Sequence, residues 1–336
     1  MIALTIVGAV VVFVGYGWWH EYCPESVEVI YQSEGEMIGS DTLTILSWNI
    51  GYAGLGDNTD FFYDGGEMVQ DTPERTAENL REIISFLGEH SWVDFILLQE
   101  VDLDSKRTYH VDQFEEISAA LPDYYGWMAL NYKASYVPIP LFSAIGQVES
   151  GMALFSRYKP LQVVRLQYPS EFGFPTRLFN LKRCLLSSSF LSPSGVVYIN
   201  NTHNTAYDTG GMRTKEFAFL RDYLSDKPFS LTAGDWNSNP PGYVASRGEI
   251  ENEYFSPISI EEGSLGDGVT FAYDTLTDHY TARYGYQAYD PQSTIRTVID
   301  FVAVGSGFEV LDIRVLDLGF RNSDHNPVIF RVRVVR

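Results

Sequence analysis

The first hydrophobic pattern in the chain is a continuous apolar run at the N-terminus. Residues 2–19 contain no charged side chain, and the run ends in Trp18, Trp19 and His20. A helix of about 18 residues rises roughly 27 Å, close to the thickness of a bilayer's hydrocarbon core, and paired tryptophans are typical of the membrane interface. We therefore predict that residues 1–20 form a hydrophobic signal anchor or a cleaved signal peptide, and that residues 2–19 contact a membrane.

The flanking sequence favours the anchor over the signal peptide, because the run has no preceding Lys or Arg and no small-x-small cleavage site follows it. Bulky Tyr22 before Cys23 is not typical of a lipidation site. Residues 21–40 carry five glutamates and are predicted to be a polar spacer, and residues 41–336 a single catalytic domain. We expect the protein to be membrane-anchored or secreted, with the folded part facing away from the cytoplasm.

Strand-like patterns recur from residue 41 to the end of the chain. Alternating or continuously apolar runs predict strands over residues 42–50, 92–98, 151–157, 178–186, 196–204, 229–237, 297–304 and 328–334. Thr72 and Pro73 are typical of the N-cap and first position of a helix, and apolar residues follow them at helical spacing to residue 87. Residues 213–224 predict a second amphipathic helix. Strands outnumber helices in this reading.

Polar side chains stand where several of these strands end. Asn49, Glu100 and His203 each close an apolar run, and Asp235 and Asn237 follow the next one. A carboxylate at the end of a buried strand is costly unless it is paired or binds a cation. Glu100 is therefore a strong candidate metal ligand. Because residues i and i+2 of an extended strand face the same side, Asp235 and Asn237 are expected to face one bound group.

Two more acids and a histidine occur near the C-terminus. Asp300 lies inside a run that is otherwise apolar, and Asp324 and His325 stand directly before the last predicted strand. A buried acid needs a partner, and an imidazole is a suitable one. The Asp-His-Asn-Pro sequence is also ordinary turn chemistry, so its meaning depends on whether the other polar groups join it.

Composition and charge narrow the classes of function. With 336 residues, of which 45% are hydrophobic and 15% aromatic, the chain can bury a large core. Its formal net charge of −21 repels polyanions, so strong nucleic-acid binding is not expected, although a bound cation can reverse the local sign at one site. Two cysteines, Cys23 and Cys184, cannot form a disulfide framework, and whether they pair is open.

Two short segments carry candidate contacts for an anionic substrate. A cation or a phenol in either segment could meet a phosphate group. A solvated loop or a strand surface is the alternative explanation for each. The candidates are Lys106, Arg107, Tyr109, Lys182 and Arg183.

Taken together, the strand-end motifs resemble those of the endonuclease/exonuclease/phosphatase superfamily, whose fold is deoxyribonuclease-I-like. The resemblance implies an α/β four-layer sandwich, in which two packed, mainly antiparallel β-sheets are flanked by helices. Six motifs in order carry it: Trp48-Asn49-Ile50, Gln99-Glu100-Val101, Thr202-His203-Asn204, Gly234-Asp235-Trp236-Asn237, Ile299-Asp300-Phe301 and Ser323-Asp324-His325.

For the metal, the resemblance implies that Glu100 is the principal ligand, with Asn49 beside it and Asp324 as the second acid. Oxygen ligands of this kind suit Mg²⁺, with Mn²⁺ as the alternative. The number of metal ions is left open.

The same resemblance implies the catalytic roles. Asp235 would orient or deprotonate the attacking water, and Asn237 would hold a phosphate oxygen. His325 would be the imidazole on the scissile phosphate, with Asp300 fixing its tautomer, and His203 matches the other histidine of the site. A carboxylate behind an imidazole raises its basicity and makes the imidazolium a better stabiliser of the transition state.

The expected function is that of a metal-dependent hydrolase of phosphoester bonds. A phosphodiesterase that cleaves a lipid headgroup or another small phosphodiester by in-line attack of water is the first hypothesis, since a membrane-tethered site suits such substrates. An extracytoplasmic endonuclease or exonuclease is the alternative, and a phosphomonoesterase is the third hypothesis. A binding protein that has kept the fold and lost the chemistry is the hypothesis from another class. Oligomeric state and native substrate are open.

Overall fold

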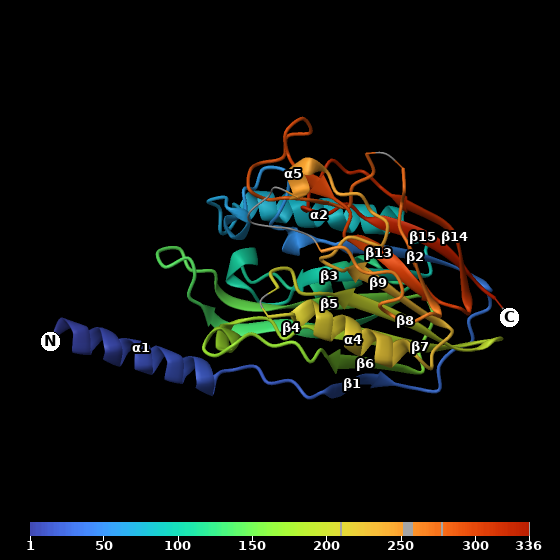
Figure 1. Ribbon diagram of the computed structural model, residues 1–336, viewed down its shortest axis with the longest axis horizontal. Helices are drawn as coiled ribbons and strands as arrows, with labels where there is room; N and C mark the ends of the chain where they lie inside the picture. Colours follow the sequence, from blue (N-terminus) through green and yellow to red (C-terminus); the bar gives the residue numbers. More distant parts are fainter. Residues whose placement is uncertain (209, 251–257, 277, 336) are drawn as a thin grey trace.

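Two β-sheets form the centre of the folded chain. The computed structural model describes residues 1–208, 210–250, 258–276 and 278–335 (Figure 1). In order across the first sheet, the seven strands are β1 (Val27–Gln32), β6 (Gln162–Gln167), β7 (Cys184–Ser192), β8 (Gly195–His203), β9 (Ser230–Asp235), β13 (Asp300–Gly305) and β10 (Val269–Ala272). The six strands of the second sheet are β14 (Phe308–Val315), β15 (Val328–Val334), β2 (Thr42–Asn49), β3 (Phe95–Asp102), β5 (Gly146–Ser156) and β4 (Tyr125–Val137).

Neighbouring strands are antiparallel except for two pairs, β2 with β3 and β8 with β9. A short ribbon of β11 (Ala282–Arg283) and β12 (Arg296–Thr297) lies outside both sheets. In each parallel pair the strands end at the same edge of the sheet. The residues that end β2 and β3, and those that end β8 and β9, are therefore brought together in pairs.

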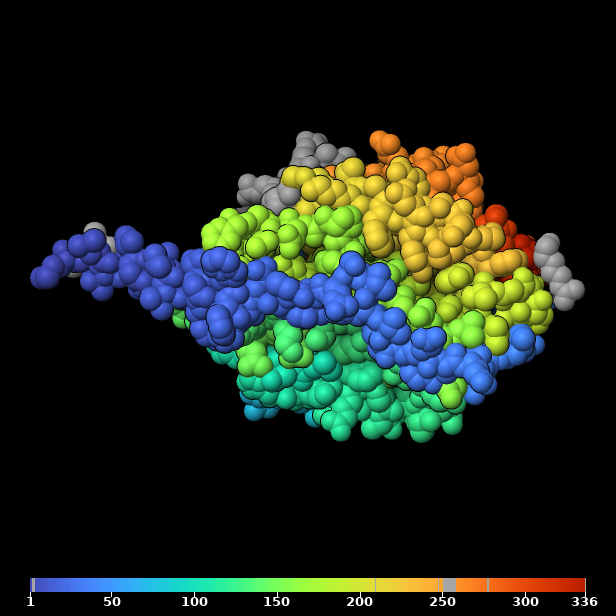
Figure 2. All heavy atoms as spheres, turned by 90° about the horizontal axis from the view of Figure 1, so that it is seen from below, coloured from blue at the N-terminus to red at the C-terminus, as the bar shows by residue number. Residues whose placement is uncertain are grey.

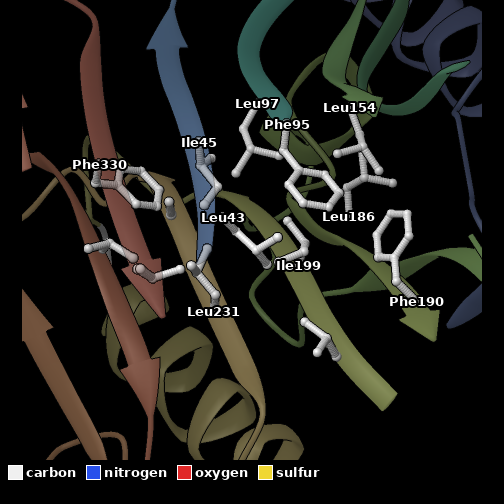
Figure 3. Packing of buried hydrophobic residues seen from close by; sticks show 14 of the residues in the cluster. Leu43, Ile45, Phe95, Leu97, Leu154, Leu186, Phe190, Ile199, Leu231 and Phe330 are labelled. Atoms are coloured by element: carbon white, nitrogen blue, oxygen red, sulfur yellow. The ribbon is translucent and has the colours of Figure 1, made fainter. Parts of the chain in front are cut away.

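The main core lies between the sheets. Leu43, Ile45 and Phe95 of one sheet pack in a single buried cluster with Ile199 and Leu231 of the other (Figure 3). These side chains occupy the inward positions of strands whose sequences alternate, which is why the pattern predicted strands. Face-to-face packing of two sheets follows.

Helices cover the two outer faces. The α-helices are α1 (Ile2–Trp19), α2 (Pro73–Glu89), α3 (Gln113–Ala120), α4 (Met212–Leu224) and α5 (Arg247–Ile250). One outer cluster joins α2 and α3 to the six-stranded sheet, and another joins α4 to the seven-stranded sheet. Short 3₁₀ turns lie at η1 (Gly51–Ala53), η2 (Phe62–Asp64), η3 (Lys106–Thr108) and η4 (Thr176–Phe179). This arrangement confirms the predicted four-layer α/β sandwich.

Helix α2 begins where the sequence predicted. The hydroxyl of Thr72 accepts a hydrogen bond from the backbone N–H of Arg75 at 3.2 Å, and Pro73 occupies the first helical position. Helix α4 and strand β15 also match the predicted ranges closely.

The prediction of a polar spacer over residues 21–40 is wrong. Residues Val27–Gln32 form β1, the edge strand of the seven-stranded sheet, which pairs with β6. Ile38 is fully buried in the core between the sheets. The glutamates of the surrounding segment concealed this strand. Within β1 itself Glu28 is half-buried and lies 3.6 Å from buried Arg165, while Val27 and Val29 are exposed. The folded unit therefore includes residues before 41.

Four predicted strands have bounds that differ from the prediction by more than two residues. One of them, the run at 151–157, lies in β5, which begins earlier, at Gly146. Strand β3 begins at Phe95 instead of residue 92 and continues to Asp102. The run at 178–186 becomes a strand at Cys184, since η4 occupies its first residues. The run at 297–304 is split into β12 and β13, because the hydroxyl of Thr281 accepts hydrogen bonds from the N–H groups of Ile299 and Asp300 at 2.9 and 3.0 Å.

The N-terminal apolar run is helical, as expected, and α1 projects from one end of the molecule (Figures 1 and 2). We predicted that this run is an anchor long enough to span a bilayer. Within the described part of the chain, no helix has the length and apolarity needed to cross a membrane.

Candidate active site

The polar strand ends of both sheets meet at one place. Across the seven-stranded sheet, His203 is the register partner of Asp235, and Asp235 is the partner of Asp300. Three residues far apart in the sequence therefore form a row across β8, β9 and β13. The six-stranded sheet contributes Asn49 from the end of β2 and Glu100 from β3. The sequence predicted the strand ends, and the register aligns them.

His325 joins this row through an acid behind its ring. Its Nδ1 lies 2.8 Å from Oδ2 of Asp300, and its Nε2 lies 3.7 Å from Oδ2 of Asp235. Burial opposes a charge on this imidazole, but Asp300 and Asp235 together raise the pKa of His325 well above its usual value. The ring is therefore held as an imidazolium that donates to Asp300 from one nitrogen and turns the other toward Asp235.

The tripeptide around His325 is held by backbone contacts. The hydroxyl of Ser323 donates to the carbonyl of Asn49 at 2.7 Å and accepts from the N–H of His325 at 3.1 Å. The indole N–H of Trp48 donates to the carbonyl of His325 at 2.8 Å. These bonds fix the loop before β15 against the end of β2, so the turn chemistry and the site chemistry coexist in one loop.

Asp235 is buried and receives several donors. Its Oδ1 accepts from the backbone N–H of Asn237 at 2.9 Å, and its Oδ2 accepts from Nδ2 of Asn49 at 3.0 Å. Burial raises its pKa to about 6, an increase that the charge of His325 opposes. This carboxyl is ionised at neutral pH but holds its proton more tightly than an exposed aspartate.

Asp235 and Asn237 do share the site, for a different reason from the one predicted. The strand ends at Asp235, and Asn237 has a left-handed φ of 47° in the turn that follows. Its amide Nδ2 donates to the carbonyl of Asn204 at 2.9 Å. A turn closed by the Asp235 carboxylate, not an extended chain, brings these two side chains to one cavity.

His203 is a neutral imidazole. Its Nε2 lies 3.3 Å from Oδ2 of Asp235 and 3.8 Å from Oε1 of Glu100. Burial, reinforced by Arg183 and His325, holds its pKa well below the usual value. Its buried Nδ1 has no hydrogen-bond partner within the described part of the chain. The two histidines of the site thus carry different charges at the same pH.

Glu100 is presented by a distortion of β3. Its φ is 54°, and the register of β3 with β5 shifts between Leu98 and Val101. Such a bulge re-aims a side chain out of the strand's alternation. Oε1 of Glu100 accepts from Nδ2 of Asn49 at 3.2 Å. The irregularity at this residue is invisible in the sequence, which reads as a regular apolar strand with an acid at its end.

The amide of Asn49 presents nitrogen, not oxygen, to the acids. Its Nδ2 donates to Glu100 and Asp235, and its Oδ1 accepts from the N–H of Gly51 at 3.0 Å. Ligation of a metal through Oδ1 would require the amide to turn over and would leave the Gly51 N–H without that acceptor. In this arrangement Asn49 holds the two carboxylates in place.

The acids near Glu100 fit a divalent cation. Burial, together with the charges of Glu100 and Asp64, raises the pKa of Asp324 to about 7 against the opposing charges of His325 and Arg283. Neighbouring carboxylates that disfavour each other's ionisation are stabilised by a hard cation with oxygen preference. Glu100 and Asp324 are the residues that would hold such an ion.

A second group of ligand atoms is close enough to hold a metal. One ligand atom each from Asp235, Asp300 and His325 lie within 4.8 Å of one another. However, Nδ1 of His325 is already hydrogen-bonded to Asp300, and a protonated imidazole has no free lone pair for a metal. The chemistry of this group is that of a carboxylate–imidazolium pair, and the better cation position is beside Glu100.

These residues border a cavity of about 370 Å³. Glu100, Asp235, Asp324 and His325 line one part of it. Much of the remaining wall is aromatic, formed by Tyr52, Phe61, Tyr63, Tyr132, Phe172, Tyr207 and Tyr284. A cavity of this size accepts a small ligand.

Of the predicted substrate contacts, two arginines line the cavity. Arg183 is buried, and its Nη1 donates to the carbonyl of His203 at 3.3 Å. Arg107 forms a bidentate pair with Asp102 at 2.8 and 3.0 Å and stacks on the ring of Tyr52. Arg183 therefore has more capacity for a ligand than Arg107.

The other three predicted contacts are directed elsewhere. Lys106 donates to the carbonyl of Ala144, and Tyr109 to the carbonyl of Asp71. Nζ of Lys182, which lies just before β7, is 2.9 Å from a carboxylate oxygen of Glu21. None of their side chains lines the cavity. Adjacent residues point in different directions, so the sequence neighbours of Arg107 and Arg183 do not line the cavity with them.

Sequence reasoning missed two charged residues of the cavity. Arg283 is buried and donates to the carbonyls of Gly56 and Thr59 at 2.7 and 3.2 Å. Asp64 accepts from the Tyr207 hydroxyl and the Gly285 N–H, and burial raises its pKa. Asp64 lies in the aromatic segment 61–66, where an acid among apolar residues was the available signal. Arg283 had none.

Glu216 was also missed, although it supports the site from behind. This fully buried carboxylate of α4 accepts from Nδ2 of Asn204 and the N–H of Thr205, both at 3.0 Å, and from the hydroxyl of Ser170 at 2.6 Å. It fixes the loop that follows His203. On a predicted helix, a glutamate is normally exposed, so the sequence indicated nothing special here.

Comparison with known proteins places this arrangement in context. The sequence matches the profile of the Endonuclease/Exonuclease/phosphatase family over residues 46–325. That range spans all the strand ends described above. No curated protein sequence matches the chain.

Solved structures share the architecture at low sequence identity. An endonuclease/exonuclease/phosphatase from Beutenbergia cavernae is 20% identical with a TM-score of 0.59, covering 88% of this chain and 72% of that chain. D. rerio TDP2, complexed with a single-strand DNA product, is 16% identical with a TM-score of 0.55, covering 87% and 99%. ANGEL2, a 2′,3′-cyclic phosphatase in complex with adenosine-2′,3′-vanadate, is 17% identical with a TM-score of 0.54, covering 91% and 99%. At these identities the likeness shows the fold.

Proposed function

The chain belongs to the endonuclease/exonuclease/phosphatase family, and from this premise we propose that it is a divalent-metal-dependent phosphodiesterase. We propose that it hydrolyses a lipid headgroup or another small phosphodiester by in-line attack of water. The observation that carries the proposal is the Asp300–His325–Asp235 arrangement beside the acids Glu100 and Asp324, at one cavity.

In this mechanism His325 stabilises charge on the phosphoryl group. Its Nδ1 is held by Asp300 at 2.8 Å, so the proton on Nε2 is available to an oxygen in the cavity. The raised pKa keeps the ring positive at neutral pH. A preorganised positive donor at the position where charge develops is the largest single contribution in reactions of this kind.

Asp235 takes the proton of the attacking water. A base with a pKa of about 6 is ionised at neutral pH and accepts a proton more readily than an ordinary aspartate. Asn49 and the backbone N–H of Asn237 fix its two oxygens. Neutral His203, with Nε2 3.3 Å from the carboxylate, restrains it further without adding a charge.

Glu100 and Asp324 would hold a divalent cation, Mg²⁺ or Mn²⁺. The bound ion supplies Lewis-acid neutralisation of phosphoryl or leaving-group oxygens. Asn49 orients Glu100 for this purpose through its 3.2 Å hydrogen bond.

The substrate class follows from the size and walls of the cavity. A volume of about 370 Å³ fits a headgroup or a mononucleotide, and the aromatic walls suit an apolar or flat leaving group. The net charge of −21 is unfavourable for a long polyanion. A small phosphodiester satisfies both conditions.

A nuclease that acts on single-stranded ends is the second candidate. Aromatic side chains stack on bases, and the cavity wall offers several. TDP2, complexed with a single-strand DNA product, shares the fold. A substrate panel separates the two candidates: sphingomyelin and phosphatidylinositol phosphates on one side, single-stranded and duplex DNA on the other. Cleavage confined to DNA would exclude the lipid hypothesis.

The activity itself is tested with bis-p-nitrophenyl phosphate. The full chain should hydrolyse it in the presence of Mg²⁺, and His325→Ala should lower turnover by about 10³-fold. His110→Ala is the matched control, because His110 also pairs with an aspartate, Asp104, but on the surface and away from the cavity. A folded chain that binds Mg²⁺ yet cleaves no phosphoester would be a binding protein on this fold.

A further inference from the structure

One end of the molecule carries a large exposed apolar surface, which we call the apolar platform. It consists of helix α1, the loop at 139–142 and Phe174. Leu141 is 79% exposed, Phe142 99% and Phe174 62%, and Trp19 at the end of α1 is 87% exposed. Figure 2 shows the N-terminal part of α1 projecting beyond the folded body. Exposed apolar side chains gathered at one end of a molecule mark a site that meets another protein or a membrane, so this surface needs an occupant.

Helix α1 is attached to the body at its C-terminal half. Phe13 stacks on Phe179 at a ring-centroid distance of 4.9 Å and meets Tyr136 edge-on at 6.2 Å. Gly17 lies so close to the Phe179 ring that an added Cβ would be 2.3 Å from it. Glu21, just after the helix, pairs with Lys182 at 2.9 Å. The direction of α1 is therefore set by the folded domain.

The same contacts connect the platform to the cavity. Phe179 belongs to η4, and its carbonyl accepts from the hydroxyl of Tyr132, which lines the cavity. Asn180 and Leu181, directly after η4, also line it. The loop at 139–142 follows β4, the strand that carries Tyr132 and Tyr136. The platform and one wall of the cavity are thus built on the same two segments.

The occupant must accept apolar side chains from all sides of α1. Leu4, Ile6, Val7, Val10, Val11 and Val12 are all more than half exposed, and at helical spacing they point in every direction around the axis. A protein groove covers one face of a helix and would leave the others in water. Lipid surrounds an inserted helix, and tryptophans at its end suit the headgroup region.

We propose that the apolar platform docks on a lipid surface and presents the cavity to it. With a net charge of −21, the chain is repelled by anionic lipids, so the surface is one of zwitterionic headgroups. Residues 2–19 contribute no charge of their own to oppose insertion. The docking itself is independent of catalysis. Its consequence, that the substrate is a zwitterionic phosphodiester lipid taken from that surface, rests on the proposed function.

Binding is tested by flotation. The full chain is synthesised in a cell-free system in the presence of phosphatidylcholine vesicles. The chain should float with the vesicles, and less so when phosphatidylserine is included. Leu141→Ser/Phe142→Ser should lower the partition coefficient about tenfold, because binding scales with the apolar area inserted. Leu311→Ser is the matched control, since it removes a partly exposed leucine from β14, at the opposite edge of the six-stranded sheet from β4. Equal thermal unfolding midpoints would show that all variants fold.

Several outcomes would overturn the proposal. The first is a wild-type chain that stays in the soluble fraction, and the second is equal flotation of all variants. The third is a chain that forms a dimer in the absence of vesicles and is monomeric as Leu141→Ser/Phe142→Ser. The last result would identify a second copy as the occupant.

Catalysis is tested with the same phosphodiester lipid in two forms, short-chain monomers and vesicles. The platform variant should lose at least about tenfold of its rate on vesicles and keep its rate on monomers, because neither residue lines the cavity. If the chain floats with vesicles but cleaves neither form, the proposed function fails and the docking surface stands. If both forms are cleaved equally by wild type and variant, the platform does not present the substrate.

Discussion

Two sides of the same cavity use the same kinds of residue but balance their charges differently. On the imidazole side, Asp300 and Asp235 flank His325, and the positive ring compensates the acids. On the carboxylate side, Glu100 and Asp324 lie near each other, and the pKa of Asp324 rises to about 7. The first side is complete within the chain. On the second side Arg283 opposes the rise in the pKa of Asp324 without cancelling it. This difference separates the group that holds a proton from the group suited to a metal ion.

The difference also explains why Asn49 is placed between the two sides. Its amide nitrogen donates to Glu100 at 3.2 Å and to Asp235 at 3.0 Å, one acid from each side. A neutral donor restrains both carboxylates without deciding which one is protonated. The different charge balance of the two sides therefore depends on burial and on His325, not on the amide of Asn49.

The largest expected effect distinguishes the two sides by their response to metal. His325→Ala and Glu100→Gln should each lower kcat/KM for bis-p-nitrophenyl phosphate by about 10³-fold, the scale of losing a preorganised charge in a transition state. Raising the Mg²⁺ concentration should restore part of the loss in Glu100→Gln, because its remaining partner Asp324 still attracts the ion. It should restore nothing in His325→Ala. Equal recovery in both variants would contradict the assignment of the metal ion to the carboxylate side and of the bound proton to the imidazole side.

A smaller effect is expected when the imidazole side loses its outer acid. Asp300→Asn should lower kcat about 30-fold and move the alkaline limb of the pH profile to lower pH. The sign follows from the pKa of His325, which Asp300 raises: without that charge the ring loses its proton at a lower pH. Asp104→Asn at the surface His110 pair is the control and should leave the profile unchanged. A profile unaltered in Asp300→Asn would show that His325 is not the titrating group.

Arg183 tests whether the two sides share a positive charge. The acids Asp235 and Glu100 both act on its guanidinium, and its Nη1 donates to the carbonyl of His203. Arg183→Met should raise KM for a phosphodiester about fivefold, since a charge-assisted bond to the ligand would be lost. Lys106→Met is the comparison, because Lys106 does not line the cavity, and its KM should not change. A change of equal size in both variants would indicate a general effect of net charge.

The smallest effect concerns stability. Asp235 and Asp324 have folded pKa values of about 6 and about 7, above their unfolded value of 3.8. Each therefore contributes stability at low pH that is lost as pH rises through its folded pKa. Without metal, the temperature of the thermal unfolding midpoint should decrease as the pH is raised from 5 to 8. Mg²⁺ should raise that temperature by roughly 5 °C at pH 8 and by much less at pH 5. Differential scanning fluorimetry measures both. In Asp324→Asn the Mg²⁺ effect should shrink, and an undiminished effect would place the ion elsewhere.

Features set by neighbouring residues in the sequence were predictable, whereas features set by contacts between distant segments were not. Thr72-Pro73 and the alternation of residues 328–334 report local preferences, and both elements formed where expected. The edge strand β1 was missed because its six residues lie in a segment rich in glutamates, and only the pairing with β6 makes them part of the sheet. The break between β12 and β13 depends on Thr281, a side chain from another segment.

The sequence by itself determined which chemical groups stand at the strand ends, because each follows an apolar run that the core buries. Only the tertiary structure decided how they are used. The register of β8, β9 and β13 aligned His203, Asp235 and Asp300, and a bulge turned Glu100 out of β3. Packing directed Arg183 to the cavity and Lys182 away from it, toward Glu21. Local sequence sets the period of a strand, whereas register, bulges and partners depend on contacts between residues that the chain brings together only on folding.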